Sequence, residues 1–128
     1  MSNFKLNFLH VCEQVIIDTT GNISVINIFN QINSLNFPAI HPKFCIFCNI
    51  IGYQTGRYDI EIIINNENVP VATVKGKIEI ASLKSEANFI ANFINFRFDK
   101  EGDYGIEVKV DGNKINDKDY IVKLKKNV

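Results

Sequence analysis

The sequence contains no tryptophan, only two histidines and only three cysteines in 128 residues. The cysteines are Cys12, Cys45 and Cys48, an odd number at low density. A small secreted domain held together by disulfides would need more of them, in pairs. The scarcity of cysteine therefore favours a reducing compartment, and we expect a cytoplasmic protein.

The chain also lacks an excess of either charge. Lysine plus arginine (14) equals aspartate plus glutamate (14), so the formal net charge is +0. Binding to nucleic-acid phosphates needs clustered basic side chains. Lys123, Lys125 and Lys126 form the only basic cluster, and we expect no nucleic-acid partner.

Long hydrophobic runs are missing as well. Residues 1–6 show no charged segment followed by an apolar run, and no span of 18 apolar residues occurs anywhere. We therefore expect neither a signal peptide nor a membrane segment. Hydrophobic residues still make up 46% of the chain. That amount supports one folded domain over residues 1–128, with no need for a metal or disulfide.

Signatures of catalysis are absent too. The chain has no Gly-x-Ser-x-Gly, no phosphate-binding loop and no dinucleotide fingerprint. The acidic residues at strand positions alternate with apolar ones and are expected on a solvated face: Glu13, Asp59, Glu61 and Glu107. Without a recognisable acid–base pair, we expect no enzyme, no catalytic residue and no cofactor.

Two stretches, 56–64 and 102–110, share one pattern. In each, a glycine ends a turn, a tyrosine follows two residues later, and aliphatic residues then occupy every second position. A period of two is typical of a strand with one buried face. Tyr58 and Tyr104 are in phase with the aliphatics. We expect both rings in the core, with each hydroxyl bonded near the end of its strand.

The same alternation, interrupted by turns every 8–12 residues, predicts an all-β fold. We expect a two-layer antiparallel β-sandwich, immunoglobulin-like or C2-like, or else a small barrel, with seven to eight strands. Residues 30–42, with Phe37-Pro38 and His41-Pro42, are expected to form a loop. The expected strands are 6–18, 23–29, 43–52, 58–64, 69–80, 88–98, 104–110 and 120–125.

Segment 88–98 allows two interpretations. Phe89, Ala91 and Phe93 share one parity, whereas Ile94, Phe96 and Phe98 share the other. A β-bulge near residues 93–94 would place both sets in the core. A short helix capped by Ser85 is the rival interpretation. We favour the strand because phenylalanine and isoleucine prefer pleated surfaces.

Cysteine and histidine could in principle hold zinc. Cys45 and Cys48 have the spacing of a Cys-x-x-Cys site, but residues three apart in a strand point to opposite faces. His10, Cys12, His41 and Cys45 are four further possible ligands. Nothing in the sequence brings the loop of His41 to the strand of Cys12. We therefore expect no metal site, a buried Cys12, and a His41 packed in its proline-braced loop.

Two acidic turns resemble calcium ligand sets. One contains Asp99, Glu101 and Asp103; the other contains Asp111, Asn113, Asp117 and Asp119. They flank strand 104–110 at opposite ends, so we expect them not to combine, and neither matches the twelve-residue calcium loop. Both are expected to be ordinary solvated turns.

The strand at 43–52 is apolar on both parities, and Ile63 is apolar at an outward position. A sandwich strand is usually solvated on one side. Either the chain covers this outer face, for which the 30–42 loop is a candidate, or a protein partner does. A second copy of the chain is the simplest such partner.

Three segments also resemble a known family: Phe8–Glu13, Gly21–Phe29 and Phe37–Pro42. The chain is similar from about Phe8 to Leu124 to short bacterial proteins that carry only a "domain of unknown function" label. Members of that family share a cysteine followed by an acidic residue, a Gly-x-Ile/Leu-Ser turn, a Phe-Pro-x-x-His-Pro loop and a late Gly-x-Tyr strand. The resemblance implies one β-sandwich domain and no established activity.

These observations favour a non-enzymatic interaction or assembly module whose partner is a protein or a second copy of the chain. A sandwich that binds a small molecule or carbohydrate is the alternative. That alternative usually needs an exposed aromatic, and Tyr53 and Phe37 are the only loop candidates. An enzyme or metal-binding protein that uses the region of His41 is the third hypothesis.

Overall fold

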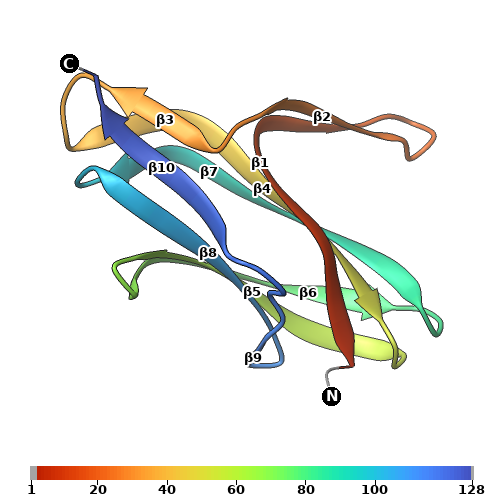
Figure 1. Cartoon of the computed structure of the whole chain (residues 1–128). Coiled ribbons are helices and arrows are strands. Elements are labelled where there is room, and N and C mark those ends of the chain that lie inside the picture. The colour runs from red at the N-terminus through yellow and green to blue at the C-terminus, as the bar shows by residue number, and fades with distance from the viewer. Residues whose placement is uncertain (1–2, 128) are drawn as a thin grey trace.

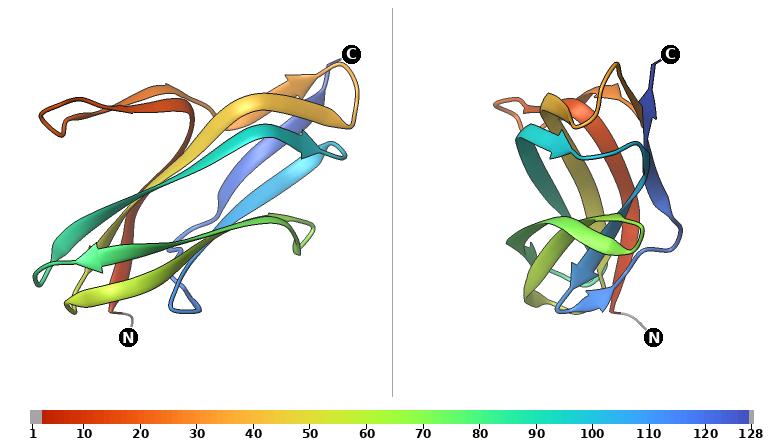
Figure 2. Two further views of the ribbon diagram at one scale, coloured as in Figure 1. Left: turned by 180° about the vertical axis from the view of Figure 1, so that it is seen from behind. Right: turned by 90° about the vertical axis from the view of Figure 1, so that its left-hand side faces the viewer.

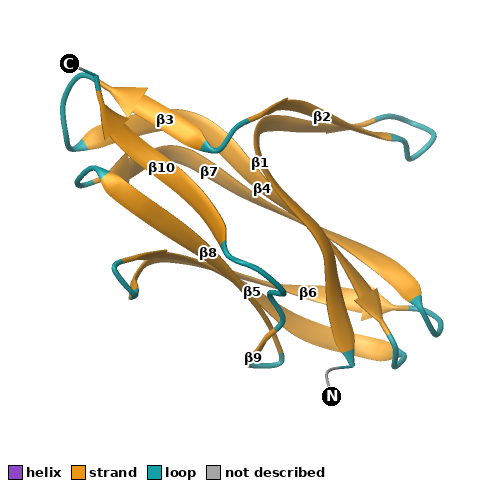
Figure 3. Ribbon diagram, viewed as in Figure 1, coloured by secondary structure: helices purple, strands orange, loops and turns teal. Residues whose placement is uncertain are grey.

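A computed structural model describes residues 3–127. These residues form strands and connecting turns, with no helix among them (Figure 3). The strands are β1 (Phe4–Ile17), β2 (Ile23–Ile28), β3 (Gln31–Ser34), β4 (Ala39–Gly52), β5 (Gly56–Asn66), β6 (Val69–Ile80), β7 (Ser85–Phe98), β8 (Gly102–Val110), β9 (Asn113–Lys114) and β10 (Tyr120–Lys126).

The strands form two sheets that pack face to face (Figure 1). The first sheet has the order β2-β1-β4-β7, and the second has the order β3-β10-β8-β5-β6 with β9 beside β8. Every strand pair is antiparallel except β3 with β10. The expected all-β sandwich is therefore confirmed.

The sequence undercounts the strands, because the described residues form ten. Residues 30–42 were expected to be a loop, but Gln31–Ser34 form β3 and Ala39 already begins β4. β3 pairs with Lys123–Lys126 in parallel. A strand of four residues is too short to show a clear alternation in its sequence. It is recognised only by its hydrogen bonds with β10.

The core lies between the sheets and follows the alternation expected from sequence. Ile46 and Ile50 of β4 face Ile60 and Ile62 of β5, and Val108 of β8 completes this fully buried group. Burying apolar surface at roughly 25 cal/mol per Å² is the main term that holds such a domain together.

Segment 85–98 is a single strand, so the short helix capped by Ser85 is wrong. β7 pairs with β4 from Ser85, opposite Gly52, to Phe98, opposite Ala39. This long antiparallel pairing supplies hydrogen bonds along one side of β7, and Phe89, Phe93, Phe96 and Phe98 pack on the core.

The bulge expected near residues 93–94 is also corrected. Phe93 and then Phe96 face the core, as expected, but Ile94 is 72% exposed. Asn95 has a left-handed φ of 52°. The register between β7 and β4 nevertheless does not shift at this point. Pro42 and Lys43, on the opposite strand, are exposed as well. The two strands therefore change faces together, and Ile94 stays outside the core.

The two sheets meet closely at one side and separate at the other (Figure 2). Gly76 of β6 has no room for a side chain, because a Cβ there would collide with the ring of Phe89 on β7. This contact brings the two edge strands together. At the opposite side, the hairpin of β1 and β2 projects beyond the other strands.

Candidate functional site

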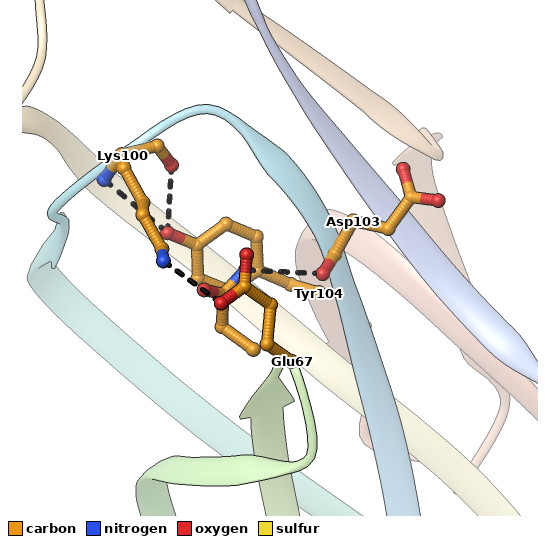
Figure 4. Close-up of polar contacts among 5 residues, drawn as sticks. Glu67, Lys100, Asp103 and Tyr104 are labelled. Atoms are coloured by element: carbon orange, nitrogen blue, oxygen red, sulfur yellow. Dashed lines mark hydrogen bonds and ion pairs between the residues drawn. The ribbon is translucent and has the colours of Figure 1, made fainter.

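Tyr58 and Tyr104 make the same local contact at the starts of β5 and β8. The hydroxyl of Tyr104 donates to the carbonyl of Lys100, four residues earlier, at 2.7 Å (Figure 4). The hydroxyl of Tyr58 lies 3.0 Å from the carbonyl of Gln54, also four residues earlier. The prediction that both hydroxyls bond near the strand ends is confirmed. The ring of Tyr104 lies in the core as predicted, whereas the ring of Tyr58 is half-buried and packs against the core.

Cys45 and Cys48 lie on opposite faces of β4, as the sequence predicts. Cys48 packs in the core, and burial raises the pKa of its thiol to about 12. Cys12 lies opposite Cys45 across β1 and β4. Burial, reinforced by the neighbouring Cys45, raises the pKa of the Cys12 thiol to about 11. All three cysteines are free and buried, an environment that disfavours the reactive thiolate.

The two histidines do not converge with the thiols. His41 lies on β4, not in a loop, and packs between Phe29 and Phe44 with ring centroids 5.7 Å from each. His10 stacks on Phe8 on the outer face. Since Phe44 faces the core, His41 and Cys45 are on opposite sides of the sheet. Among residues 3–127, no group of three or more histidine, cysteine, aspartate or glutamate side chains could hold a metal ion.

The outer face of β4 is covered by the chain itself. Cys45 and Phe47 are at most 3% exposed. Phe47 lies under Phe8 of β1, with ring centroids 5.2 Å apart. The thiol of Cys45 donates to Asn92 Oδ1 of β7 at 3.0 Å. The cover comes from neighbouring strands and not from segment 30–42, so Cys45 and Phe47 offer no free apolar surface to a partner.

An uncovered apolar surface lies elsewhere, on the hairpin of β1 and β2. Val15 pairs with Val25 and Ile17 pairs with Ile23 on one face. On the other face, which also carries Gln14, lie the exposed isoleucines that we call the hairpin patch: Ile16, Ile26 and Ile28, each at least 40% exposed. The sequence shows these residues as ordinary strand positions, because alternation separates the two faces of a strand but does not tell what covers either face.

The outer face of the second sheet carries an open hollow of about 820 Å³. Its floor is β8 around Gly105, and its walls are the β5–β6 turn and the segment from Lys114 to Ile121. The two acidic turns were expected not to combine as calcium ligands. One residue of each, Asp103 and Asp119, lines this same hollow, because β10 runs back along β8 and pairs Ile121 with Gly105.

The loop aromatics expected to serve as a binding platform do not line the hollow. Tyr53 is exposed at the β4–β5 turn, and Phe37 packs against the core. Tyr120 does line the hollow. Its ring is half-buried, with the ammonium of Lys118 5.1 Å from the ring centroid.

No helix within residues 3–127 is long and apolar enough to cross a membrane. Residues 7–123 match the model of a family described as "Family of unknown function (DUF6941)". No curated protein matches the chain.

Proposed function

The chain belongs to this family of unknown function, and we propose that it is a non-catalytic assembly module that pairs with a second copy of itself through strand β2. In this proposal it works in a reducing compartment such as the bacterial cytoplasm, where three buried thiols remain free. The hairpin patch is the observation that carries the proposal.

The hairpin patch exposes large aliphatic side chains to solvent. Ile28 is 57% exposed, and Ile16 and Ile26 are 42% and 40% exposed. Single exposed aliphatic residues are common, but three on one face of a short hairpin form a patch that marks a protein contact.

β2 is also an edge strand without the usual protection. It lies at the end of its sheet, and its sequence from Ile23 to Ile28 contains no charge and no proline. Two of the other edge strands are protected: β6 has Pro70 and exposes Lys75 and Lys77, and β7 contains Glu86 and Arg97. The remaining edge strand, β3, also lacks charge and proline but is only four residues long. Edge strands commonly carry charges or proline to prevent pairing with other chains. Their absence from β2 leaves it open to the addition of a strand.

A second copy of β2 fits this edge well. Two copies can pair antiparallel about a two-fold axis, which is the commonest symmetry of protein dimers. Because β2 is uncharged and the chain has a formal net charge of +0, no like-charge repulsion opposes the pairing. The isoleucines of the two patches would then pack beside one another.

Size-exclusion chromatography with light scattering tests the proposal. The chain should elute at twice its mass of 14.6 kDa. Replacing Ile26→Lys together with Ile28→Lys should give a monomer, because the charges would repel across the axis. The exposed Ile94 on β7 provides the matched control, and Ile94→Lys should remain a dimer.

Thermal unfolding separates loss of pairing from loss of fold. The double variant should keep a cooperative transition, because exposed substitutions typically change stability by only about 0.5 kcal/mol each. A wild-type chain that stays monomeric at rising concentration, or a double variant that still dimerises, would show that β2 is not the interface.

A further inference from the structure

We propose that the hollow on the outer face of the second sheet is a binding site for a saccharide. This inference is independent of the pairing through β2, because the two surfaces belong to different sheets. It rests on the shape of the floor, on an unexplained glycine, and on the mixture of polar groups in the walls.

The floor is a row of residues across four adjacent strands. Gly105 of β8 pairs with Asn65 of β5 on one side and with Ile121 of β10 on the other. Pro70, from the strand next to β5, lies opposite Asn65 and extends the row. All four residues line the hollow. The row therefore combines apolar surface from Pro70 and Ile121, which is 41% exposed, with the polar amide of Asn65.

Gly105 has no structural reason to be glycine. A Cβ at Gly52 or Gly76 would collide with a neighbouring side chain, whereas a Cβ at Gly105 would meet nothing within 4 Å. Its φ also lies outside the left-handed region that favours glycine. Glycine inside a strand costs roughly 0.5–1 kcal/mol relative to alanine. Such a glycine often marks the place where a ligand approaches the backbone closely.

The walls are held in place by the chain itself. Asn116 accepts from the amide of Val108 at 2.7 Å and donates to the carbonyl of Ile106 at 2.8 Å. On the opposite side, Asn66 donates to the carbonyl of Asp103 at 3.2 Å, and Lys100 pairs with Glu67 at 3.1 Å (Figure 4). A site fixed in this way loses little conformational freedom on binding.

The polar groups favour hydroxyls over a cation. Within residues 3–127, the side chains of Asn65, Asn68, Asp103 and Asp119 line the hollow and make no hydrogen bond or ion pair with the chain. The two amides offer donors as well as acceptors, while the two carboxylates only accept. A sugar hydroxyl can satisfy both kinds of group. An ammonium can only donate, so it would leave the amide donors unmatched. The side chains of Ile121 and Pro70 offer apolar surface to the C–H face of a sugar.

Binding can be tested by nuclear magnetic resonance with the full chain. Glucose, galactose, N-acetylglucosamine and their short oligomers are titrated, with spermidine as a cationic comparison. Saturable shifts should appear at the amides of Asn65, Gly105 and Ile121 with at least one sugar and not with spermidine. Asp119→Asn should weaken the affinity, because it replaces an acceptor oxygen with a donor.

Gly105→Val provides the sharper test. Its side chain has space in the free protein, so the melting temperature should stay the same or rise. It would fill the floor, and the affinity should fall by about tenfold or more. Lys109→Val, four residues along the same face and outside the hollow, should bind like the wild type. Shifts with spermidine alone, no saturable shift with any sugar, or unchanged affinity in Gly105→Val would overturn the proposal.

Discussion

At the scale of single residues, the most informative feature is the repeated tyrosine contact. Gly56 and Gly102 both adopt a positive φ, of 144° and 136°. Each glycine turns the chain so that the tyrosine two residues later can bond back to a carbonyl four residues before it. The repeated pattern in the sequence is therefore a device that starts two strands, and it explains why both copies need glycine and tyrosine together.

Replacing Tyr104→Ala should lower the free energy of unfolding by roughly 3–5 kcal/mol, because the ring is 3% exposed and packs on Phe98. Tyr104→Phe should cost only about 0.5–1.5 kcal/mol, since it removes the hydroxyl bond and keeps the ring. Urea unfolding measures both. A melting temperature unchanged in Tyr104→Ala would contradict the assignment of this ring to the core.

The cysteines should be unreactive in the folded protein. With pKa values of about 11 for Cys12 and about 12 for Cys48, almost no thiolate is present at neutral pH. Ellman's reagent should therefore react slowly with the native chain and should titrate three thiols after unfolding in urea. Rapid labelling of the native chain would show that at least one thiol is accessible.

At the scale of elements, the hairpin of β1 and β2 differs from the rest of the sandwich. Asp18 closes its turn by accepting from the hydroxyl and amide of Thr20 at 2.7 and 2.9 Å, and from the amide of Asn22 at 2.9 Å. Gly21, with a φ of 88°, completes the turn. Local hydrogen bonds thus hold a hairpin whose tip lies beyond the second sheet.

The Asp18 carboxyl should titrate below its ordinary pKa of 3.8. The hydroxyl of Thr20 contributes most to lowering this pKa, followed by the amide of Asn22. The folded state favours the carboxylate, so its stabilising contribution is present above the unfolded pKa and is lost as pH falls through the lowered folded pKa. Carbon-detected magnetic resonance should show the lowered midpoint, and Thr20→Ala should raise it. A midpoint at or above 3.8 in the wild type would show that the turn bonds are absent.

β4 shows how an element can be apolar on both sides without a partner. It lies between β1 and β7 in the first sheet. Phe8 and Asn92 of these neighbours reach over its outer face, while the core covers the other. A central strand gains this cover from side chains on both flanks, whereas an edge strand such as β2 has a neighbour on one flank only.

At the scale of the whole molecule, hydrophobic burial dominates and charge plays a small part. Among the described residues there are four ion pairs, and each has at least one side chain that is more than half exposed. Such pairs contribute about 0–1 kcal/mol each, because water and salt screen them. At one side of the sandwich, the two sheets meet through the close packing of Gly76 against the ring of Phe89, a contact that involves no charge.

Stability should therefore depend weakly on ionic strength. The free energy of unfolding, measured by urea denaturation at low and at moderate sodium chloride, should differ by less than about 1 kcal/mol. Lys77→Ala, which removes the ion pair with Asp59, should show a similarly small effect. A large loss of stability in salt would mean that the surface charges act as a network.

The sequence by itself determined the class of fold and most of the strands. Strict alternation identifies a buried face locally, and turn residues such as Gly102 and Asp111-Gly112 separate the strands. The segment 69–80 was predicted residue for residue as β6. The positions of Tyr58 and Tyr104, and the opposite orientations of Cys45 and Cys48, also follow from the period of two, because that period is a property of the backbone.

Only the tertiary structure decided which surfaces are free. Whether Phe47 or Ile26 is covered depends on the strands beside and beneath it, and alternation carries no information about them. The same holds for the hollow, since Asp103 and Asp119 are brought together by the return of β10 along β8. Local pattern fixes which way a side chain points. The packing of distant segments determines what it meets, and both candidate binding surfaces arise at that level.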